Sequence, residues 1–199
     1  MYRALISAWL AGLASALLPQ PALADDSARV NELIQTRCFV CHGLNGESST
    51  PAFPRLSGQH AAYTVRQLAD FKSGRRRSDS MKPMVEDLSD KDFELLGAFF
   101  QQQPALAHAG GDPALAAQGK KLFLEGKGSG AACATCHGTS GHGAEYVPRL
   151  AGQHAQYLVK QMQSFKDRER PAPAVLAKAV AGLNERDIQA LAAYLSGLK

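Results

Sequence analysis

Two short segments of the chain share one pattern of cysteine and histidine. Residues 38–42 read Cys-Phe-Val-Cys-His and residues 133–137 read Cys-Ala-Thr-Cys-His, and together they contain all four cysteines of the chain. In such a segment the two thiols add across the vinyl groups of a haem, and the adjacent imidazole takes one axial position on the iron. The pattern therefore predicts two covalently attached haem c groups. The expected haem-binding residues are Cys38, Cys41, Cys133 and Cys136, and the expected iron ligands are His42 and His137.

Two other uses of paired cysteines were weighed against this prediction. A zinc site closes a tetrahedron with cysteine and histidine ligands, but a histidine directly after the second cysteine does not usually complete the same tetrahedron. A redox-active dithiol of the thioredoxin kind expects a β-α-β surrounding. The sequence around residues 38–42 and 133–137 shows no such surrounding, so haem attachment is favoured over both alternatives.

The predicted elements of the first half lead the chain to and from its Cys-x-x-Cys-His segment. Apolar residues at 30, 33, 34 and 38 follow the spacing of one helix face and predict a first helix. A second helix is predicted over 60–72. A third begins at Ser89, an N-cap residue with Asp92 at the third helical position. A mostly polar loop over 73–87 joins the last two, and no segment alternates for long enough to indicate a strand.

The second half repeats this plan. Residues 148–154 copy 54–60 in the pattern Pro-Arg-Leu-x-Gly-Gln-His, and residues 183–187 copy the helix start at 88–92. Copies of about 85 to 90 residues are each large enough to be a domain, which favours a tandem duplication over a solenoid. The expected fold is all-α, with two domains that each wrap around an attached haem. The expected boundaries are 25–103 for the first domain, 104–113 for a linker and 114–199 for the second domain.

The first 24 residues are typical of a cleaved secretory signal. Arg3 supplies the positive start, residues 4–18 an apolar run, and residues 22–24 a small-x-small cleavage site. The apolar run is shorter than the roughly 20 residues that a membrane-spanning helix needs, so cleavage is favoured over an uncleaved anchor. We therefore expect an exported, periplasmic protein whose mature chain begins near Asp25.

The charge balance gives no support to a nucleic-acid partner. The whole chain carries a net charge of +4, and removal of Arg3 leaves 21 basic against 18 acidic residues, or +3. Two haems would add four propionates and bring the protein close to neutral. The basic run at 75–77 is expected to be a solvated loop.

One axial position on each iron remains to be assigned. Electron carriers usually fill it with methionine or histidine, and a thioether ligand raises the reduction potential. In the first half the candidates are Met81 and Met84. Both lie in the loop before the last helix, where the chain must return to cover the other face of the haem.

The order of these motifs resembles that of the dihaem cytochromes c4, over essentially the whole mature chain. The shared features are two Cys-x-x-Cys-His domains, each with a Pro-x-Leu-x-Gly-Gln stretch and a leucine-serine type of helix start. The resemblance implies two tandem class I cytochrome c folds, with Met81 on the first iron and Met84 packed nearby. It also implies a non-enzymatic electron carrier between a quinol-oxidising complex of the cytochrome bc1 type and terminal oxidases or reductases, with loose association with the membrane left open.

The second half departs from the ligand pattern of this family. Phe71 and Phe165 are 94 positions apart, whereas Leu88 and Leu183 are 95 apart, so Met81 corresponds to Val175 or Leu176. Neither side chain can bind iron. Met162, the one methionine of this half, aligns with a leucine inside a helix and is expected to belong to the core.

Three interpretations of the second iron follow. The haem could be five-coordinate, with a distal pocket lined by Val175 and Leu176. Lys178 could bind as a neutral amine, or His142, His154 or a rearranged Met162 could reach the iron. The first two interpretations predict a lower potential at the second haem than at a methionine-ligated first haem. An alternative function follows as well, in which the second haem binds or reduces peroxide, O₂ or NO.

Overall fold

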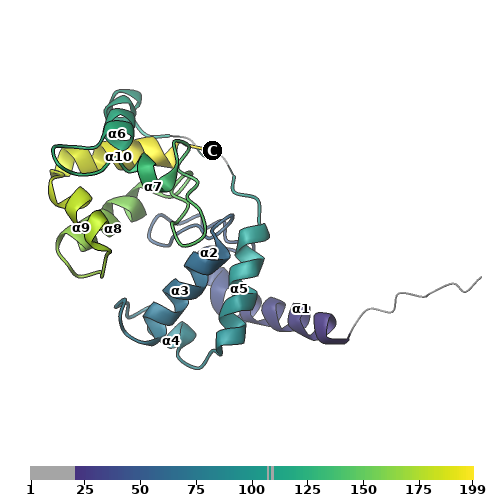
Figure 1. Ribbon diagram of the computed structural model, residues 1–199. Helices are drawn as coiled ribbons and strands as arrows, with labels where there is room; N and C mark the ends of the chain where they lie inside the picture. Colours follow the sequence, from purple (N-terminus) through teal and green to yellow (C-terminus); the bar gives the residue numbers. More distant parts are fainter. Residues whose placement is uncertain (1–20, 107, 109) are drawn as a thin grey trace, which may run out of the picture.

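The computed structural model describes residues 21–106, 108 and 110–199, and in this part the chain forms two helical lobes (Figure 1). The predicted signal cleavage site lies at the start of the first helix, and residues 1–20 of the predicted signal lie outside the described part. The first lobe contains α1 (Pro21–Leu33), the π-helix η1 (Ile34–Cys38), α2 (Phe39–His42), α3 (Ala61–Lys72), α4 (Lys82–Val85) and α5 (Asp90–Gln102). The second contains α6 (Pro113–Glu125), α7 (Ala134–His137), α8 (Ala155–Lys166), α9 (Ala174–Ala181) and α10 (Glu185–Ser196).

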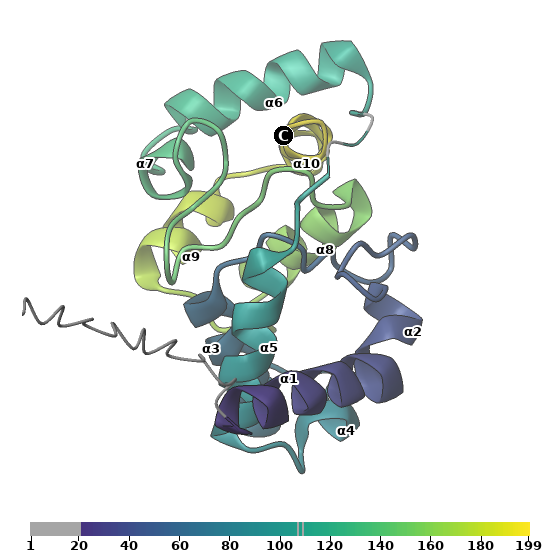
Figure 2. The ribbon, with the colours of Figure 1, turned by 90° about the vertical axis from the view of Figure 1, so that its right-hand side faces the viewer.

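The expected all-α class is confirmed. Among the described residues the only β-type pairing is an isolated bridge between Ala144 and Val147. The described part also contains no helix with the length and apolar character needed to cross a membrane. Figure 2, turned by 90°, shows the same division, with α1 to α5 in one lobe and α6 to α10 in the other.

The core of the first lobe forms where α3 and α5 pack together and α1 crosses α5. The apolar face predicted over 30–38 is confirmed, because Leu33 and Ile34 are buried and Val30 and Cys38 pack against the same core. Three of its buried residues are phenylalanines, Phe71, Phe93 and Phe100. The fully or nearly fully buried residues of this core are Leu33, Ile34, Phe71, Val85, Leu88, Phe93, Leu96 and Phe100.

The second lobe is built around the close packing of α6 on α10. Gly119 of α6 lies against the main chain of α10, and a Cβ atom there would collide with the carbonyl of Ala190. Phe123 and Leu191 are buried at this contact, and α8 packs on another side of α10. The absence of a side chain at one position thus sets how closely the two helices approach. The helix that leads to the second attachment motif is α6 itself, which begins at Pro113.

Both lobes begin their last helix with a capping box. The Ser89 hydroxyl accepts from the Asp92 N–H at 3.1 Å, and the Asp92 carboxylate accepts from the Ser89 N–H at 2.8 Å. Asn184 and Asp187 form the same pair at the start of α10. Arg29 of α1 adds a hydrogen bond to Asp92 at 2.8 Å, and this guanidinium holds the pKa of the Asp92 carboxyl far below its ordinary value. The cap therefore also ties α1 to α5.

Replacement of either N-cap residue tests these helix starts. Ser89→Ala and Asn184→Ala each leave an N-terminal N–H of the helix without its partner, and each should lower the free energy of unfolding by about 1 kcal/mol. Ser80→Ala is a matched control, since Ser80 is exposed in the loop before α4. Urea unfolding followed by circular dichroism measures the change. Losses equal to that of the control would show that the caps do not stabilise these helices.

Candidate functional site

Each Cys-x-x-Cys-His segment lies on one short helical turn that ends at its histidine. In the first lobe η1 runs directly into α2, and in the second lobe α7 carries the motif. Each turn is followed by a glycine with positive φ, 74° at Gly43 and 71° at Gly138. A side chain is disfavoured in this conformation, so glycine allows the main chain to leave the helix immediately after the histidine.

Both motif histidines are oriented by the same hydrogen bond. His42 Nδ1 lies 2.8 Å from the carbonyl oxygen of Pro54, and His137 Nδ1 lies 3.0 Å from that of Pro148. A carbonyl only accepts, so Nδ1 carries the proton and the neutral ring leaves the Nε2 lone pair available to a metal. Burial lowers the pKa of both imidazoles, more than the proline contacts raise it. The repeated Pro-Arg-Leu stretch is visible in the sequence, but its role in orienting the histidines was not predicted.

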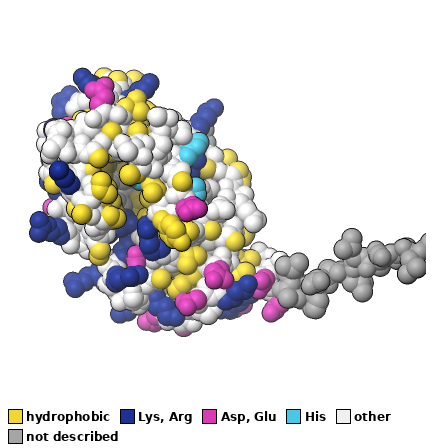
Figure 3. Space-filling view, in the orientation of Figure 1, with side chains coloured by type: hydrophobic (Ala, Val, Ile, Leu, Met, Phe, Trp, Pro, Cys, Tyr) yellow, Lys and Arg dark blue, Asp and Glu magenta, His cyan; other side chains and the backbone are white. Residues whose placement is uncertain are grey.

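The first cysteine of each motif packs on the core of its lobe. Cys38 packs against the first core and Cys133 against the second. Burial raises the pKa of the Cys38 thiol to about 11 and also raises that of Cys133. Apolar side chains near the first motif remain exposed, with Phe39 at 44%, Val40 at 75% and Leu44 at 55%. Apolar side chains also gather around a recess in the view of Figure 3.

The two methionines of the first lobe occupy different environments. Met81 precedes α4 and packs, as Cys38 does, against the core of the first lobe. Met84 is 39% exposed, and its carbonyl oxygen lies 3.5 Å from a guanidinium nitrogen of Arg37. Of the two candidates, Met81 is therefore the one that faces the interior of the lobe beside the attachment motif.

In the second lobe the position of Met81 is taken by Leu176. Leu176 lies on α9 and packs against the core that contains Cys133, whereas Val175 is 54% exposed. Leu176 precedes the buried Leu183 by seven residues, as Met81 precedes Leu88. The structure thus selects one of the two alignments left open by the sequence. The helix α9 itself was not predicted.

The other candidate ligands of the second half are held elsewhere. Met162 lies in α8 and packs on the second core, as its counterpart Leu68 packs on the first. His142 Nε2 donates to the main-chain oxygen of Lys199 at 2.6 Å, and His154 Nε2 donates to the Ser48 carbonyl at 2.8 Å. The structure therefore gives these three side chains other partners.

Comparison with known proteins agrees with this arrangement. The family model for cytochrome c matches residues 27–104 and 116–199. Cytochrome c4 of Stutzerimonas stutzeri is 39% identical over 178 residues, which cover 81% of this chain and 84% of that protein. The crystal structure of reduced recombinant cytochrome c4 from Pseudomonas stutzeri is 36% identical, with a TM-score of 0.82, and covers 88% of this chain and 99% of that chain. The chain belongs to the cytochrome c4 family.

Membership of the cytochrome c4 family establishes the cofactor and the general role. Two cytochrome c domains in tandem imply two covalently bound haem c groups and a dihaem electron-transfer protein. Another relative, the thiosulfate dehydrogenase electron acceptor of Stutzerimonas stutzeri (strain A1501), is 32% identical over 209 residues and covers 95% of this chain and 94% of that protein. The predicted fold of two tandem cytochrome c domains is confirmed.

The two lobes of this cytochrome c4 relative meet through reciprocal glutamine contacts. Gln59 accepts from the Arg149 N–H at 2.9 Å and donates to its carbonyl at 3.1 Å. Gln153 makes the corresponding pair of bonds to the main chain of Arg55, both at 2.9 Å. Both glutamine side chains are buried. Because each residue has its counterpart 94 positions along the chain, the interface has approximate two-fold symmetry.

Two arginines make a second reciprocal set at the same interface. Arg76 donates to the Tyr157 hydroxyl at 2.8 Å, and Arg170 donates to the Tyr63 hydroxyl at 2.8 Å. Burial raises the pKa of Tyr157, but the two guanidiniums beside it lower the pKa more, so the net direction is downward. The basic run at 75–77 was expected to be a solvated loop. This holds for the exposed Arg75 but is wrong for Arg76, which crosses to the other lobe.

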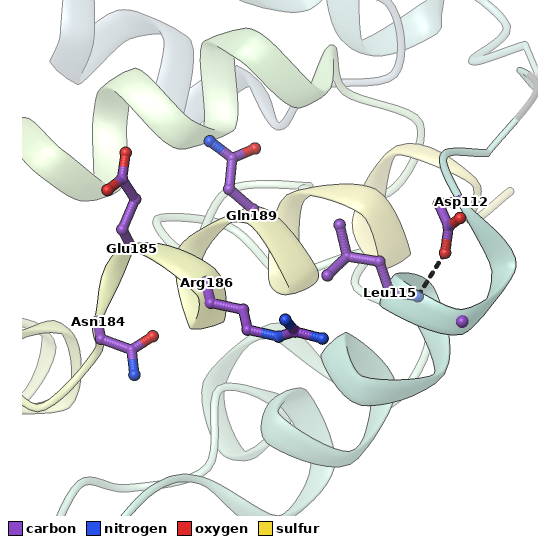
Figure 4. Close-up of a pocket in the computed structure, with 7 residues that line it drawn as sticks. Asp112, Leu115, Asn184, Glu185, Arg186 and Gln189 are labelled. Carbon is purple, nitrogen blue, oxygen red and sulfur yellow. Dashed lines mark hydrogen bonds between the residues drawn. The ribbon is translucent and has the colours of Figure 1, made fainter.

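A groove lies away from both attachment motifs, at the first turns of α6 and α10 (Figure 4). The Asp112 side chain is engaged as the N-cap of α6, where it accepts from the Leu115 N–H at 2.8 Å. The lining offers no cysteine, histidine or methionine, so it takes no part in the haem sites. The lining residues are Asp112, Ala114, Leu115, Asn184, Glu185, Arg186 and Gln189.

The buried glutamines should stabilise the contact between the lobes. Gln59→Ala and Gln153→Ala each leave a buried main-chain N–H and carbonyl of the opposite lobe unpaired, so each should lower the free energy of unfolding of the holoprotein by about 1–3 kcal/mol. Urea titration measures the loss. Gln156→Ala, on the exposed face of α8, is the matched control. Losses no greater than that of Gln156→Ala would contradict the role of these contacts.

Proposed function

We propose that the protein is a periplasmic electron carrier with one haem in each lobe. Cys38 and Cys41 hold the first haem, whose iron is ligated by His42 and Met81. The single observation that carries the proposal is the shared orientation of the motif histidines. Nδ1–H of each ring donates to a proline carbonyl, of Pro54 or Pro148, so both Nε2 lone pairs are available to bind iron. The second haem is held by Cys133, Cys136 and His137.

The residues around the two motifs fit such a group. Arg149 has a buried Nε atom without a hydrogen-bond partner in the described part of the chain, and burial lowers its pKa. A guanidinium in this state fits a carboxylate such as a haem propionate. Arg55 also has a buried Nε without a hydrogen bond, with Glu47 at ion-pair distance, 3.5 Å. The apolar residues exposed around the first motif fit the flat apolar body of a haem.

When bound, the haem supplies reversible one-electron chemistry at iron. The chain supplies the axial ligands and keeps the two groups in a fixed relation through the interface of Gln59 and Gln153. A thioether from Met81 raises the potential of the first haem. The Leu176 side chain cannot do so in the second lobe. The site of His137 and Leu176 would therefore give its haem a lower potential than the site of His42 and Met81 would give.

The redox partners we propose are a quinol-oxidising complex of the cytochrome bc1 type and a terminal oxidase or reductase. The relative whose printed name is thiosulfate dehydrogenase electron acceptor supports a sulfur-oxidising enzyme as a further donor. Interfaces between redox partners are commonly small and weak.

Catalytic reduction of a ligand is less well supported than electron transfer. Activation of peroxide needs an acid–base group placed over the iron. The α9 side chains that pack into the second core, Leu176 and Val180, are both apolar. We therefore assign the protein no enzymatic activity of its own.

Removal of one cysteine pair should remove one haem. The double variant Cys133→Ala/Cys136→Ala should carry one covalent haem per chain and keep the methionine–iron charge-transfer band of the first haem. The corresponding variant at Cys38 and Cys41 should also carry one haem and lose that band. The haem-to-protein ratio after alkaline pyridine treatment measures the number. Two haems retained in either variant would refute the assignment of the cysteines.

Replacement of the two first-lobe methionines distinguishes ligand from neighbour. Met81→Ala should abolish the methionine–iron band and lower the potential of one haem, because a thioether stabilises the reduced iron. Met84→Ala is the control three residues away and should leave the band in place. Spectroscopy of the oxidised protein and a redox titration give both readouts. Loss of the band in Met84→Ala alone would reverse the assignment.

A further inference from the structure

We infer that the iron of the His137 haem has no side chain of this chain as sixth ligand, and that its open face, on the side of Leu176, binds a small neutral diatomic ligand such as CO or NO. The inference deepens the proposed function and rests on its assignment of His137 as the proximal ligand. It concerns a difference between two lobes that are otherwise closely matched.

Leu176 occupies the position in the second lobe that corresponds to Met81 in the first. Each lies seven residues before a buried leucine that directly precedes the N-cap of the lobe's last helix. Each is partly buried, and each packs against the core that contains the first cysteine of its lobe's attachment motif. Met81 directly precedes α4 and Leu176 lies in the first turn of α9, so the local main chain differs between the lobes. At the corresponding position before the last helix, the second lobe therefore presents a hydrocarbon side chain instead of a thioether.

Every other histidine of the chain has a contact of its own. The chain has six histidines, of which His42 and His137 are the motif histidines. Each of the other four has its Nε2 within hydrogen-bond distance of an oxygen atom of another residue. These contacts are His60 with the His142 carbonyl at 2.9 Å, His108 with the Glu47 carboxylate at 3.1 Å, His142 with the main-chain oxygen of Lys199 at 2.6 Å, and His154 with the Ser48 carbonyl at 2.8 Å.

The methionines of the chain offer no ligand opposite His137. The chain has four, and the second lobe contains only Met162. Met162 lies within α8 and packs on the second core at the position that Leu68 occupies in the first lobe. To replace Leu176 as the residue opposite His137, it would have to leave a packed helix. Because its counterpart in the first lobe is a leucine, Met162 is assigned to the hydrophobic core and not to the iron.

The lysines around the second core are paired with other groups or point away from it. Lys166 Nζ donates to the Leu183 carbonyl at 2.5 Å, and Lys127 pairs with Asp187. Lys178 is exposed and follows Leu176 by two residues on α9. Two residues correspond to a rotation of roughly 200° about a helix axis, so its side chain leaves the opposite side of α9. Lys178 could therefore reach the iron only if α9 changed its winding.

The class of ligand follows from the chemistry of the α9 face. Leu176 and Val180 face the second core and supply no donor, acid or charge. An anionic ligand would be costly to place against such a face, because burial of an uncompensated charge is unfavourable. A neutral diatomic that accepts electron density from ferrous iron needs neither a charge partner nor a proton.

The test is titration of the reduced holoprotein with CO, followed by its absorption spectrum. The wild-type protein should bind one CO per two haems. Leu176→Met should lose this binding and gain a second methionine–iron band in the oxidised spectrum. Met81→Leu is the matched exchange in the other lobe and should bind two CO per two haems. Reduced wild-type protein that binds no CO would overturn the inference.

Lys178→Ala tests the remaining alternative, in which the Lys178 amine is the sixth ligand. The variant should bind CO with the same stoichiometry and affinity as the wild-type protein. CO binding that appears only after this substitution would assign Lys178 as the sixth ligand and overturn the inference. The pyridine haem count is measured on every sample. Fewer than two haems in the wild-type protein would refute the proposed function itself, whereas two haems without CO binding would refute only the open site.

Discussion

The hydrogen bond between a motif histidine and a proline carbonyl is the contact on which both lobes depend. A neutral imidazole has one N–H and one lone pair, so fixing the N–H decides where the lone pair points. The carbonyl of Pro54 belongs to the same short stretch as Arg55 and Gln59, whose contacts join the two lobes. The orientation of an iron ligand and the contact between the domains are therefore set within six consecutive residues of each copy.

Electrostatics at the interface follow from this compact arrangement. Several guanidiniums are partly or wholly withdrawn from water, and burial lowers the pKa of Arg55 and Arg149. Arg170 is buried, and its guanidinium lies over the Phe165 ring at 4.5 Å, as that of Arg76 lies over Phe71 at 4.5 Å. Stacking on an aromatic ring and hydrogen bonds to neutral acceptors offset part of the cost of desolvation. Positive charge is thus concentrated between the lobes, where anionic cofactor groups would stabilise it.

The sequence predicts most of the helices and motifs within each lobe but few of the contacts between the lobes. The capping box at Ser89 and the helix over 60–72 were found because their signals are local, and the attachment motifs because their spacing is diagnostic. The helix α9 was missed because a short alanine-rich segment after two prolines has little periodicity. The role of Arg76 was missed because its partner Tyr157 lies 81 positions away, and a basic run looks the same whether it is solvated or docked.

The reciprocal pairing at Gln59 and Gln153 has a consequence for the origin of the fold. Gln59 of the first copy contacts Arg149 of the second, and its counterpart Gln153 contacts Arg55, the counterpart of Arg149. In an isologous interface the same pair of residues meets twice in this way. A single ancestral lobe would carry both halves of each contact and could pair with a second copy of itself about a two-fold axis. The present chain can then be understood as a symmetric dimer made covalent by fusion. Fusion would have allowed the two halves to diverge. A substitution at position 176 of one half would no longer bring the same substitution at the corresponding position of the other half, which is Met81.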